Sequence, residues 1–200
     1  MKKILLVLVV LSLCGGMLGC SGSVQRIAED EVVDLSGRWN DTDSQLVAEA
    51  MIKEALGKPW LAKFMKANQG KEPTVIIGRI KNKTDEHIAI DTFQKDMERE
   101  LTNSGMVQFV ASKNDREEIR EEREDQQTYS SEKTRKAMYE ETGADFMLQG
   151  TISKITDSRG SKATYYYQID LEMINMQSSV KAWYGNKKIK KMIKRPGARL

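Results

Sequence analysis

Hydrophobic and polar residues follow two different periods along the chain, and each period predicts its own kind of element. In 43–56 and 88–103, apolar residues recur every three or four positions, which is typical of helices with one buried face. The apolar run 73–80 and the shorter run 106–110 predict strands. Further helices are expected around 60–65, at 114–127 and at 131–141.

The first predicted helix has a candidate cap and a candidate buried face. Thr42 and Gln45 have the spacing of a capping box, in which each side chain bonds the backbone N–H of the other residue. Gly57 and Pro59 are expected to end this helix. The apolar face at helical spacing consists of Leu46, Val47, Ala50, Met51 and Ala55.

The last third of the chain has the pattern of antiparallel strands with one wet face. Apolar and polar residues alternate strictly in 163–173, with Tyr165 and Tyr167 on the apolar side and Tyr166 on the polar side. Strands at 145–155 and 180–189 flank this segment, and 157–161 is the expected loop. We therefore predict an α+β domain with a mixed, largely antiparallel sheet of about five strands and with helices packed against it.

The first twenty residues have the order of a bacterial lipoprotein signal. A short basic start precedes the apolar run 4–13, which is too short for a membrane span of about 20 residues. The run 17–20, Met-Leu-Gly-Cys, is similar to a lipobox, because Gly19 is small and the Cys20 thiol can take a diacylglyceryl group. We predict a signal peptide at 1–19 and lipid attachment at Cys20. A buried or disulfide-bonded Cys20 is the alternative.

The position after the cysteine and the length of the following segment bear on localisation. Ser21, rather than Asp, follows Cys20 and favours sorting to the outer membrane. Residues 20–34 form the lipidated cysteine and a short polar tether, and about fourteen extended residues reach only ~50 Å. The folded domain is expected at 35–192, followed by a basic C-terminal tail at 193–200.

Composition excludes several classes of protein. With 200 residues, 40% of them hydrophobic, the chain is neither wholly disordered nor, with a single long apolar run, a polytopic membrane protein. A net charge of +3 does not by itself imply a polyanionic partner, and nucleic acid is not expected as one. One histidine and two cysteines leave few options for zinc binding or histidine catalysis.

The sequence contains no recognised catalytic, cofactor-binding or metal-binding motif. It has no G-x-S-x-G elbow, Walker loop, dinucleotide fingerprint or EF-hand loop. His87 falls in a predicted turn and is expected at the surface, with a catalytic base as the alternative. Carboxylate pairs such as Glu117 and Glu121 fall on the predicted charged helix rather than in a cleft. We predict a protein that is not an enzyme, without cofactor or metal, and with no partner-contact residue assigned.

Two charged segments are candidates for contacts with a partner. The helix expected at 114–127 carries charges of both signs, which favours a solvated face over a partner-facing arm. The basic run near the end could contact anionic lipid or an acidic partner, or could be a frayed, solvated tail that protects an edge strand. This run consists of Lys187, Lys188, Lys190, Lys191, Lys194, Arg195 and Arg199.

Several segments, in this order and behind a lipobox, resemble the LpoB family of penicillin-binding protein activators, over about residues 34–189. These segments are 34–41 (DLSGRWND), 75–84 with its final KNKT, 101–105 (LTNSG), 143–150 (GADFMLQG), 167–173 (YQIDLEM) and 181–185 (KAWYG). The GADFMLQG segment also resembles the curli secretion lipoprotein CsgG.

The LpoB resemblance implies an outer-membrane lipoprotein with its domain in the periplasm. Such a protein binds a bifunctional penicillin-binding protein and stimulates peptidoglycan synthesis without catalysing a reaction itself. The CsgG resemblance implies the alternative, a structural or assembly lipoprotein of an envelope secretion or flagellar-base complex. The tether is short compared with the long, Pro-rich tether of the best-known LpoB members, since the whole chain has only three prolines.

Overall fold

The structure is a computed structural model that describes residues 23–28, 31–137 and 141–194. The chain divides into two compact units, Met1–Val32 and Val33–Leu200, and all described helices and strands lie in the second. Cys20 and the signal peptide lie outside the described residues, as do Arg195 and Arg199 of the basic run. No helix in the described ranges is long and apolar enough to cross a membrane.

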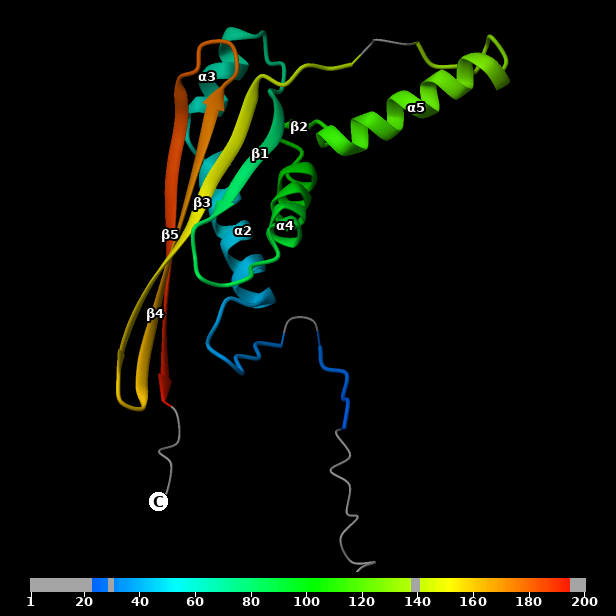
Figure 1. Cartoon of the computed structure of the whole chain (residues 1–200). Helices are drawn as coiled ribbons and strands as arrows, with labels where there is room; N and C mark the ends of the chain where they lie inside the picture. The colour runs from blue at the N-terminus through cyan, green and yellow to red at the C-terminus, as the bar shows by residue number, and fades with distance from the viewer. Residues whose placement is uncertain (1–22, 29–30, 138–140, 195–200) are drawn as a thin grey trace, which may run out of the picture. The chain divides into compact units, whose positions relative to one another are not determined.

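The described part of the second unit is built on a five-stranded mixed sheet with the order β2-β1-β3-β4-β5 (Figure 1). The strands are β1 (Thr74–Asn82), β2 (Gln108–Phe109), β3 (Phe146–Arg159), β4 (Lys162–Asn175) and β5 (Lys181–Lys194). β1 pairs in parallel with β2 and β3, whereas the long β3–β4 and β4–β5 pairs are antiparallel. The predicted α+β class and mixed sheet are confirmed.

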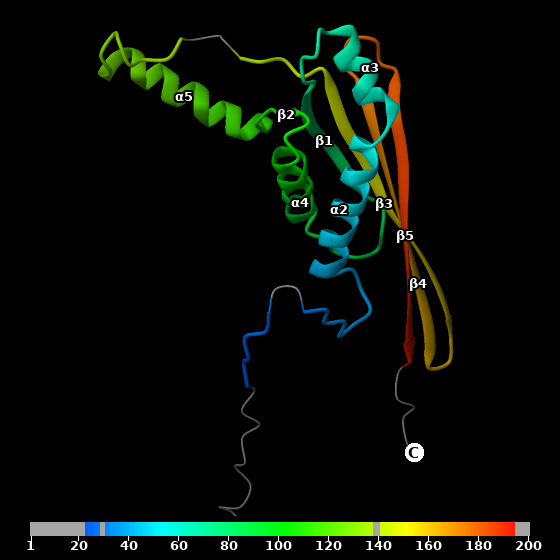
Figure 2. The same cartoon turned by 180° about the vertical axis from the view of Figure 1, so that it is seen from behind.

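The helices are α2 (Asp41–Leu56), α3 (Pro59–Ala67), α4 (Ile90–Asn103) and α5 (Lys113–Tyr129). α2 and α4 pack on each other and on the same face of the sheet, as the two opposite views show (Figures 1 and 2). Near the end of this face, Trp60 and Phe64 of α3 contact Phe146 edge-on. The core lies between these helices and the sheet, while the other sheet face, turned toward the viewer in Figure 1, carries no described helix. We call that second face the open face.

The start of α2 differs from the predicted one. Asn40 is the cap, because its side chain accepts from the Asp43 N–H at 3.0 Å while the Asp43 carboxylate accepts from the Asn40 N–H at 3.1 Å. The capping box predicted at Thr42 and Gln45 is therefore wrong by two positions. An Asn at the N-cap accepts hydrogen bonds from the same backbone N–H groups as a Thr does. The sequence therefore offers two equivalent N-cap positions, Asn40 and Thr42.

The buried face of α2 is also rotated from the predicted one. Val47, Met51 and Ala55 are buried as expected, but Leu46 is 57% exposed. Ala48 and Ile52 take its place in the core. Because α4 and β5 both press on α2, the buried stripe follows the direction set by these two neighbours rather than the largest apolar side chains.

The helix predicted at 131–141 is not formed in its described part. Residues 132–134 make a turn, 135–137 have no regular structure, and 138–140 lie outside the described residues. All side chains from 131 to 137 are exposed, so a helix here would gain no packing energy from the core. The predicted helix at 114–127 is confirmed as α5, which has no buried residue.

The three long strands extend beyond their predicted ends. The predicted loop at 157–161 shrinks to a turn at Gly160 and Ser161, since Arg159 pairs directly with Lys162. Gly160 has a φ of 59°, which suits a two-residue hairpin turn. β5 runs to Lys194, so Lys190, Lys191 and Lys194 belong to a paired strand rather than to a frayed tail.

Candidate interaction surface

Strand register arranges the open face in rows that cross β3, β4 and β5. From the helix-covered end outward, successive rows are Gln149–Glu172–Tyr184, Thr151–Asp170–Asn186, Ser153–Gln168–Lys188, Ile155–Tyr166–Lys190, Asp157–Thr164–Met192 and Arg159–Lys162–Lys194. None of these side chains is buried. The odd-numbered residues of β4, including Ile169 and Leu171, point the other way into the core. The alternation predicted for 163–173, with Tyr165 and Tyr167 inward and Tyr166 outward, is confirmed.

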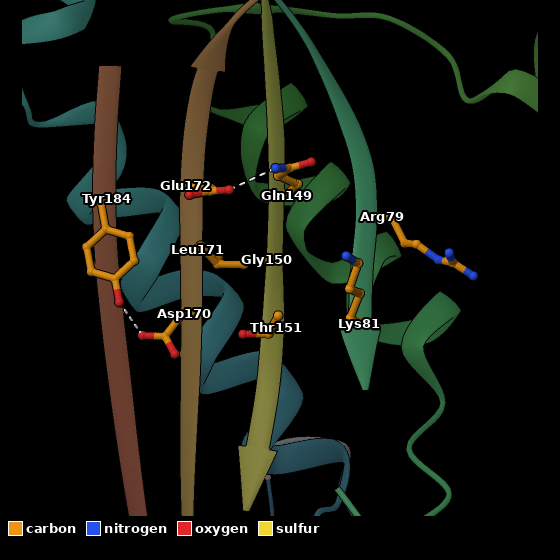
Figure 3. A pocket seen from close by; sticks show the side chains of 9 residues that line it. All are labelled: Arg79, Lys81, Gln149, Gly150, Thr151, Asp170, Leu171, Glu172 and Tyr184. Carbon is orange, nitrogen blue, oxygen red and sulfur yellow. Dashed lines mark hydrogen bonds between the residues drawn. The ribbon is translucent and has the colours of Figure 1, made fainter. Parts of the chain in front are cut away.

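The first two rows border a hollow of about 240 Å³ (Figure 3). On its other side lies β1, whose register against β3 shifts between Ile77 and Ile80. An irregularity of this kind changes the direction in which the following side chains point. Arg79 and Lys81 line the hollow from β1 and complete a rim of both charge signs.

The two carboxylates at the hollow already have hydrogen-bond or ion-pair partners within the chain. Glu172 accepts from Gln149 Nε2 at 2.8 Å and pairs with Lys181, while Asp170 accepts from the Tyr184 hydroxyl at 2.6 Å. The hydrogen bond from Lys181 is the main reason that the pKa of Glu172 lies below its usual range. The hydrogen bond to Asp170 raises the pKa of the Tyr184 phenol. Glu172 is thus held as an anion, which suits binding better than proton transfer.

The two cations at the hollow have no such partner in the described part of the chain. Arg79 and Lys81 are exposed, and neither makes an ion pair or a side-chain hydrogen bond with another described residue. A guanidinium group and an ammonium group two positions apart on one strand can accept carboxylates from a docking protein. The hollow can therefore act as a polar docking surface for an acidic side chain.

A buried polar network on the covered face was not predicted from the sequence. The Glu86 side chain is 6% exposed and accepts from Lys154 Nζ at 2.7 Å. It also accepts from the Tyr167 hydroxyl at 2.8 Å and from the Trp39 backbone N–H at 3.1 Å. Asp85 accepts from Lys154 at 2.9 Å. The network thus joins the N-terminal segment, the β1–α4 loop and strands β3 and β4.

Burial and hydrogen bonding oppose each other in this network. Burial raises the pKa of Glu86, but the donors from Lys154, Trp39 and Tyr167 outweigh it and hold that pKa below its usual range. Burial likewise lowers the pKa of Lys154, and its bonds to Glu86 and Asp85 outweigh this and raise it. Burial is the main cause of the raised pKa of Tyr167. The groups are locked in their ordinary charge states, so the network positions the loop and strands rather than moving protons.

One sequence signal could have indicated the network. Lys154 stands on β3 at the inward phase set by Leu148 and Ile152, and a lysine at such a position needs a buried carboxylate partner. The partner itself was not predictable, since Glu86 lies 68 positions earlier.

The remaining candidates take the places expected for surface residues. His87 is exposed in the β1–α4 loop, and Glu117 and Glu121 are exposed on α5. Cys20, the predicted lipid attachment site, stays a prediction because it lies outside the described residues.

Comparison with protein families gives a match that spans most of the folded unit. The model of the family described as peptidoglycan-synthase activator LpoB matches residues 43–189. The chain belongs to this family. The matched LpoB region runs from α2 into β5, and it includes the hollow and most of the open face. The resemblance stated from the sequence is confirmed. The family is one of regulatory activators, which agrees with a non-catalytic role.

Solved structures with similar chains include two of LpoB from Escherichia coli. The C-terminal domain matches with 13% identity and a TM-score of 0.43, covering 74% of this chain and 99% of that one. The NMR structure matches with 12% identity and a TM-score of 0.40, covering 88% and 86%. A lipoprotein from Neisseria meningitidis matches with 9% identity and a TM-score of 0.38, covering 60% and 83%. The comparison with curated proteins gave no match.

Proposed function

We propose that this protein is an outer-membrane lipoprotein that binds a bifunctional penicillin-binding protein and activates it. The observation that carries the proposal is the LpoB family match over residues 43–189, which takes in nearly every described element of the folded unit. The regulator itself does not react with the glycan or the peptide. It acts by contact with the synthase.

Activation by contact is a shift between conformations of the synthase. A ligand can shift such an equilibrium only by as much as it prefers one state over the other. A tenfold preference for the active conformation corresponds to about 1.4 kcal/mol, which a few ion pairs at an interface can supply.

The hollow and the rows of the open face that border it are the part of the domain that we assign to this contact. Arg79 and Lys81 have no described ion-pair partner, and their exposed positions leave them available to carboxylates of the synthase. The satisfied carboxylates Asp170 and Glu172 beside them reject anions that are not placed directly over the two cations. Charges of both signs on one rim therefore fix the orientation of the partner.

We further propose that the thioether-linked lipid on Cys20 holds the mature chain in the outer membrane. Replacement Cys20→Ala should release the protein from membranes, as checked by fractionation. A processed Cys20→Ala protein that stays in the membrane fraction would show that another segment is the anchor.

The experiment that tests activation measures glycan polymerisation by the bifunctional synthases of the same organism. The mature chain from Ser21, without lipid, is added over a range of concentrations. A saturable increase in rate supports the proposal. The double variant Arg79→Glu/Lys81→Glu should lose the increase, while the control Lys63→Glu/Lys66→Glu on exposed positions of α3 should keep it.

Two outcomes contradict the proposal. No binding and no rate change with any of these synthases would overturn the activator role, and rings in a size analysis would then support the assembly role of CsgG-like lipoproteins. Activation that survives in the Arg79→Glu/Lys81→Glu variant would overturn the assignment of the hollow.

A further inference from the structure

We propose that the outer end of the three long strands binds the anionic phospholipid surface of the membrane that holds the protein. This ribbon end comprises residues 155–166 and 188–194, the outermost parts of β3, β4 and β5 (Figure 1). The choice of a membrane rests on the proposed anchor at Cys20. The binding is separate from activation of the synthase.

The ribbon end concentrates positive charge on the open face. It carries Asp157 as its one carboxylate and six cations, which are Arg159, Lys162, Lys188, Lys190, Lys191 and Lys194. Lys191 points to the covered face and is neutralised by Asp34 and Asp43, with Nζ 3.1 and 2.6 Å from the nearer oxygens. The other five cations share the open face, and none has an ion-pair partner among the described residues.

The outermost row places like charges side by side. Arg159 pairs in register with Lys162, and Lys162 pairs with Lys194, so three cations lie on adjacent strands and on one face. Like charges directly opposite each other destabilise a strand pair. A bound layer of phosphate groups would relieve that repulsion.

Exposed apolar side chains accompany the cations. Ile155 is 65% exposed and Met192 is 68% exposed, and both lie on the open face beside Tyr166. Aliphatic and aromatic side chains among lysines are the usual composition of a surface that sits at a membrane interface, with the lysine ammonium groups at the phosphates. A soluble acidic partner would not require Ile155 and Met192 in the middle of the cations.

The first residues of the folded unit contact the ribbon end. Asp34 and the Arg38 carbonyl oxygen both accept from Lys191 Nζ. Gly37 has a φ of 66° and lies so close to Ile193 that a Cβ there would come within 2.6 Å of the Ile193 Cδ1. The chain between Cys20 and Asp34 reaches at most ~50 Å. The folded unit therefore begins beside the ribbon end, and the proposed anchor would be joined to it through this short stretch of chain.

Lipid binding and synthase binding can occur on the same face without overlap. Thr151 at the hollow and Arg159 in the outermost row are eight positions apart on β3, or about 26 Å along the strand. The ribbon end also extends past the helices, as both opposite views show. Docking of the outer rows on lipid thus leaves the hollow accessible.

The test is vesicle binding by the mature chain from Ser21, which carries no lipid of its own. Vesicles of phosphatidylglycerol and phosphatidylcholine are compared with vesicles of phosphatidylcholine alone, in a flotation assay at low and high salt. We expect binding to the anionic vesicles only, and a steep loss of binding on raising the salt. Each cation near such a surface contributes about fivefold to the partition coefficient, so Lys162→Ala/Lys194→Ala should bind about 25-fold more weakly.

Matched controls separate the ribbon end from net charge and from folding. Lys63→Ala/Lys66→Ala on α3 removes the same charge and should keep wild-type binding. Lys188→Ala/Lys190→Ala, elsewhere on the ribbon end, should weaken binding as Lys162→Ala/Lys194→Ala does. The ribbon variants remove exposed like charges, so their thermal midpoints should equal or exceed that of the wild type.

Several results would overturn the proposal. The first is absence of binding to anionic vesicles at low salt. The second is an equal loss of vesicle binding in the α3 control, and the third is equal binding to anionic and to phosphatidylcholine vesicles. Loss of synthase activation in Lys162→Ala/Lys194→Ala with unchanged vesicle binding would instead make the ribbon end a protein contact. If activation is measured in a membrane-free assay, the activator proposal can fail while lipid binding holds, and lipid binding can fail while activation holds.

Discussion

The covered and open faces of the same sheet differ in whether their lysines have carboxylate partners. On the covered face, Lys154 and Lys191 each meet two carboxylates at short distances. On the open face, Lys190 stands next to Lys191 in sequence and has no ion-pair partner in the described part of the chain. The difference teaches that a count of lysines on a strand does not distinguish a binding surface from an internal clamp. What distinguishes the two is whether each lysine has a carboxylate partner within the chain.

The largest effect is expected from an apolar substitution in the core. Ile169→Ala on the covered face should lower the free energy of unfolding by about 2–5 kcal/mol, because Ile169 is fully buried. Ile155→Ala on the open face should change it by no more than about 0.5 kcal/mol. Urea unfolding at pH 7 compares the two. Similar losses in both variants would mean that the ribbon end is packed against something in solution.

Removal of one partner of the buried network comes next. Lys154→Met should cost about 3 kcal/mol, because it leaves the nearly buried Glu86 carboxylate without its cation. Lys188→Met, on the open face of β5, removes a cation with no described ion-pair partner and should leave stability almost unchanged. A loss below about 1 kcal/mol in Lys154→Met, in thermal and urea unfolding, would show that Tyr167 and Trp39 alone can hold Glu86.

The clamp at the N-terminal segment should have a smaller effect. Lys191→Met leaves Asp34 and Asp43 without their common cation and should cost about 2 kcal/mol, since these side chains are less completely buried than Glu86. It should also increase hydrogen exchange of amides in 34–40. The neighbouring Lys190→Met is the control and should change neither property. Unchanged exchange in Lys191→Met would separate the ion pairs from the docking of this segment.

The network should also contribute to loss of stability in acid. Its hydrogen bonds hold the pKa of Glu86 below the ordinary value of 4.5, so the unfolded chain takes up this proton more readily than the folded one. The resulting stability is complete above about pH 4.5 and is lost as the pH falls through the lower folded-state pKa. Glu86→Gln should flatten this decline in urea unfolding between pH 7 and pH 3. A Glu86→Gln profile parallel to the wild type would place the acid sensitivity in other carboxylates.

The smallest effect is expected at the hollow. Tyr184→Phe removes one exposed hydrogen bond to Asp170 and should cost less than about 1 kcal/mol. In the wild type, the pKa of the Tyr184 phenol should lie above its usual range, mainly because ionisation would break the hydrogen bond that the phenol donates to Asp170. Absorbance titration of wild type against Tyr184→Phe measures this directly. A normal phenol pKa would mean that the bond to Asp170 does not persist in solution.

Local periodicity accounts for the parts of the fold that the sequence predicted well. In 163–173, successive side chains of a strand point to opposite faces, so the pattern alone assigned Tyr165 and Tyr167 to the core and Tyr166 to the open face. The helical period in the same way predicted α4, with Phe93, Met97 and Leu101 buried. The family resemblance rested on short segments of the same local kind and was confirmed.

Three of the expectations that failed did so where local preference is balanced or weak. Asn40 and Thr42 can both cap a helix, and only the packing of Trp39 beside Phe93 and Tyr167 selects the first. The segment 131–137 carries good helix formers but has no surface to pack on. The strands β3, β4 and β5 are longer than their apolar patterns predicted, because backbone hydrogen bonding between the strands continues past the core into polar sequence.

By itself, the sequence determined the class of fold, the inward and outward faces of β4 and the family, because these properties depend on residues within a few positions of each other. It also predicted an anchor at Cys20. Only the tertiary structure decided the candidate sites. Glu86 meets Tyr167 across 81 positions, and the hollow takes side chains from four strands. Arg159, Lys162 and Lys194 become neighbours only through strand register. Such contacts join segments far apart in the chain, so no local pattern encodes them.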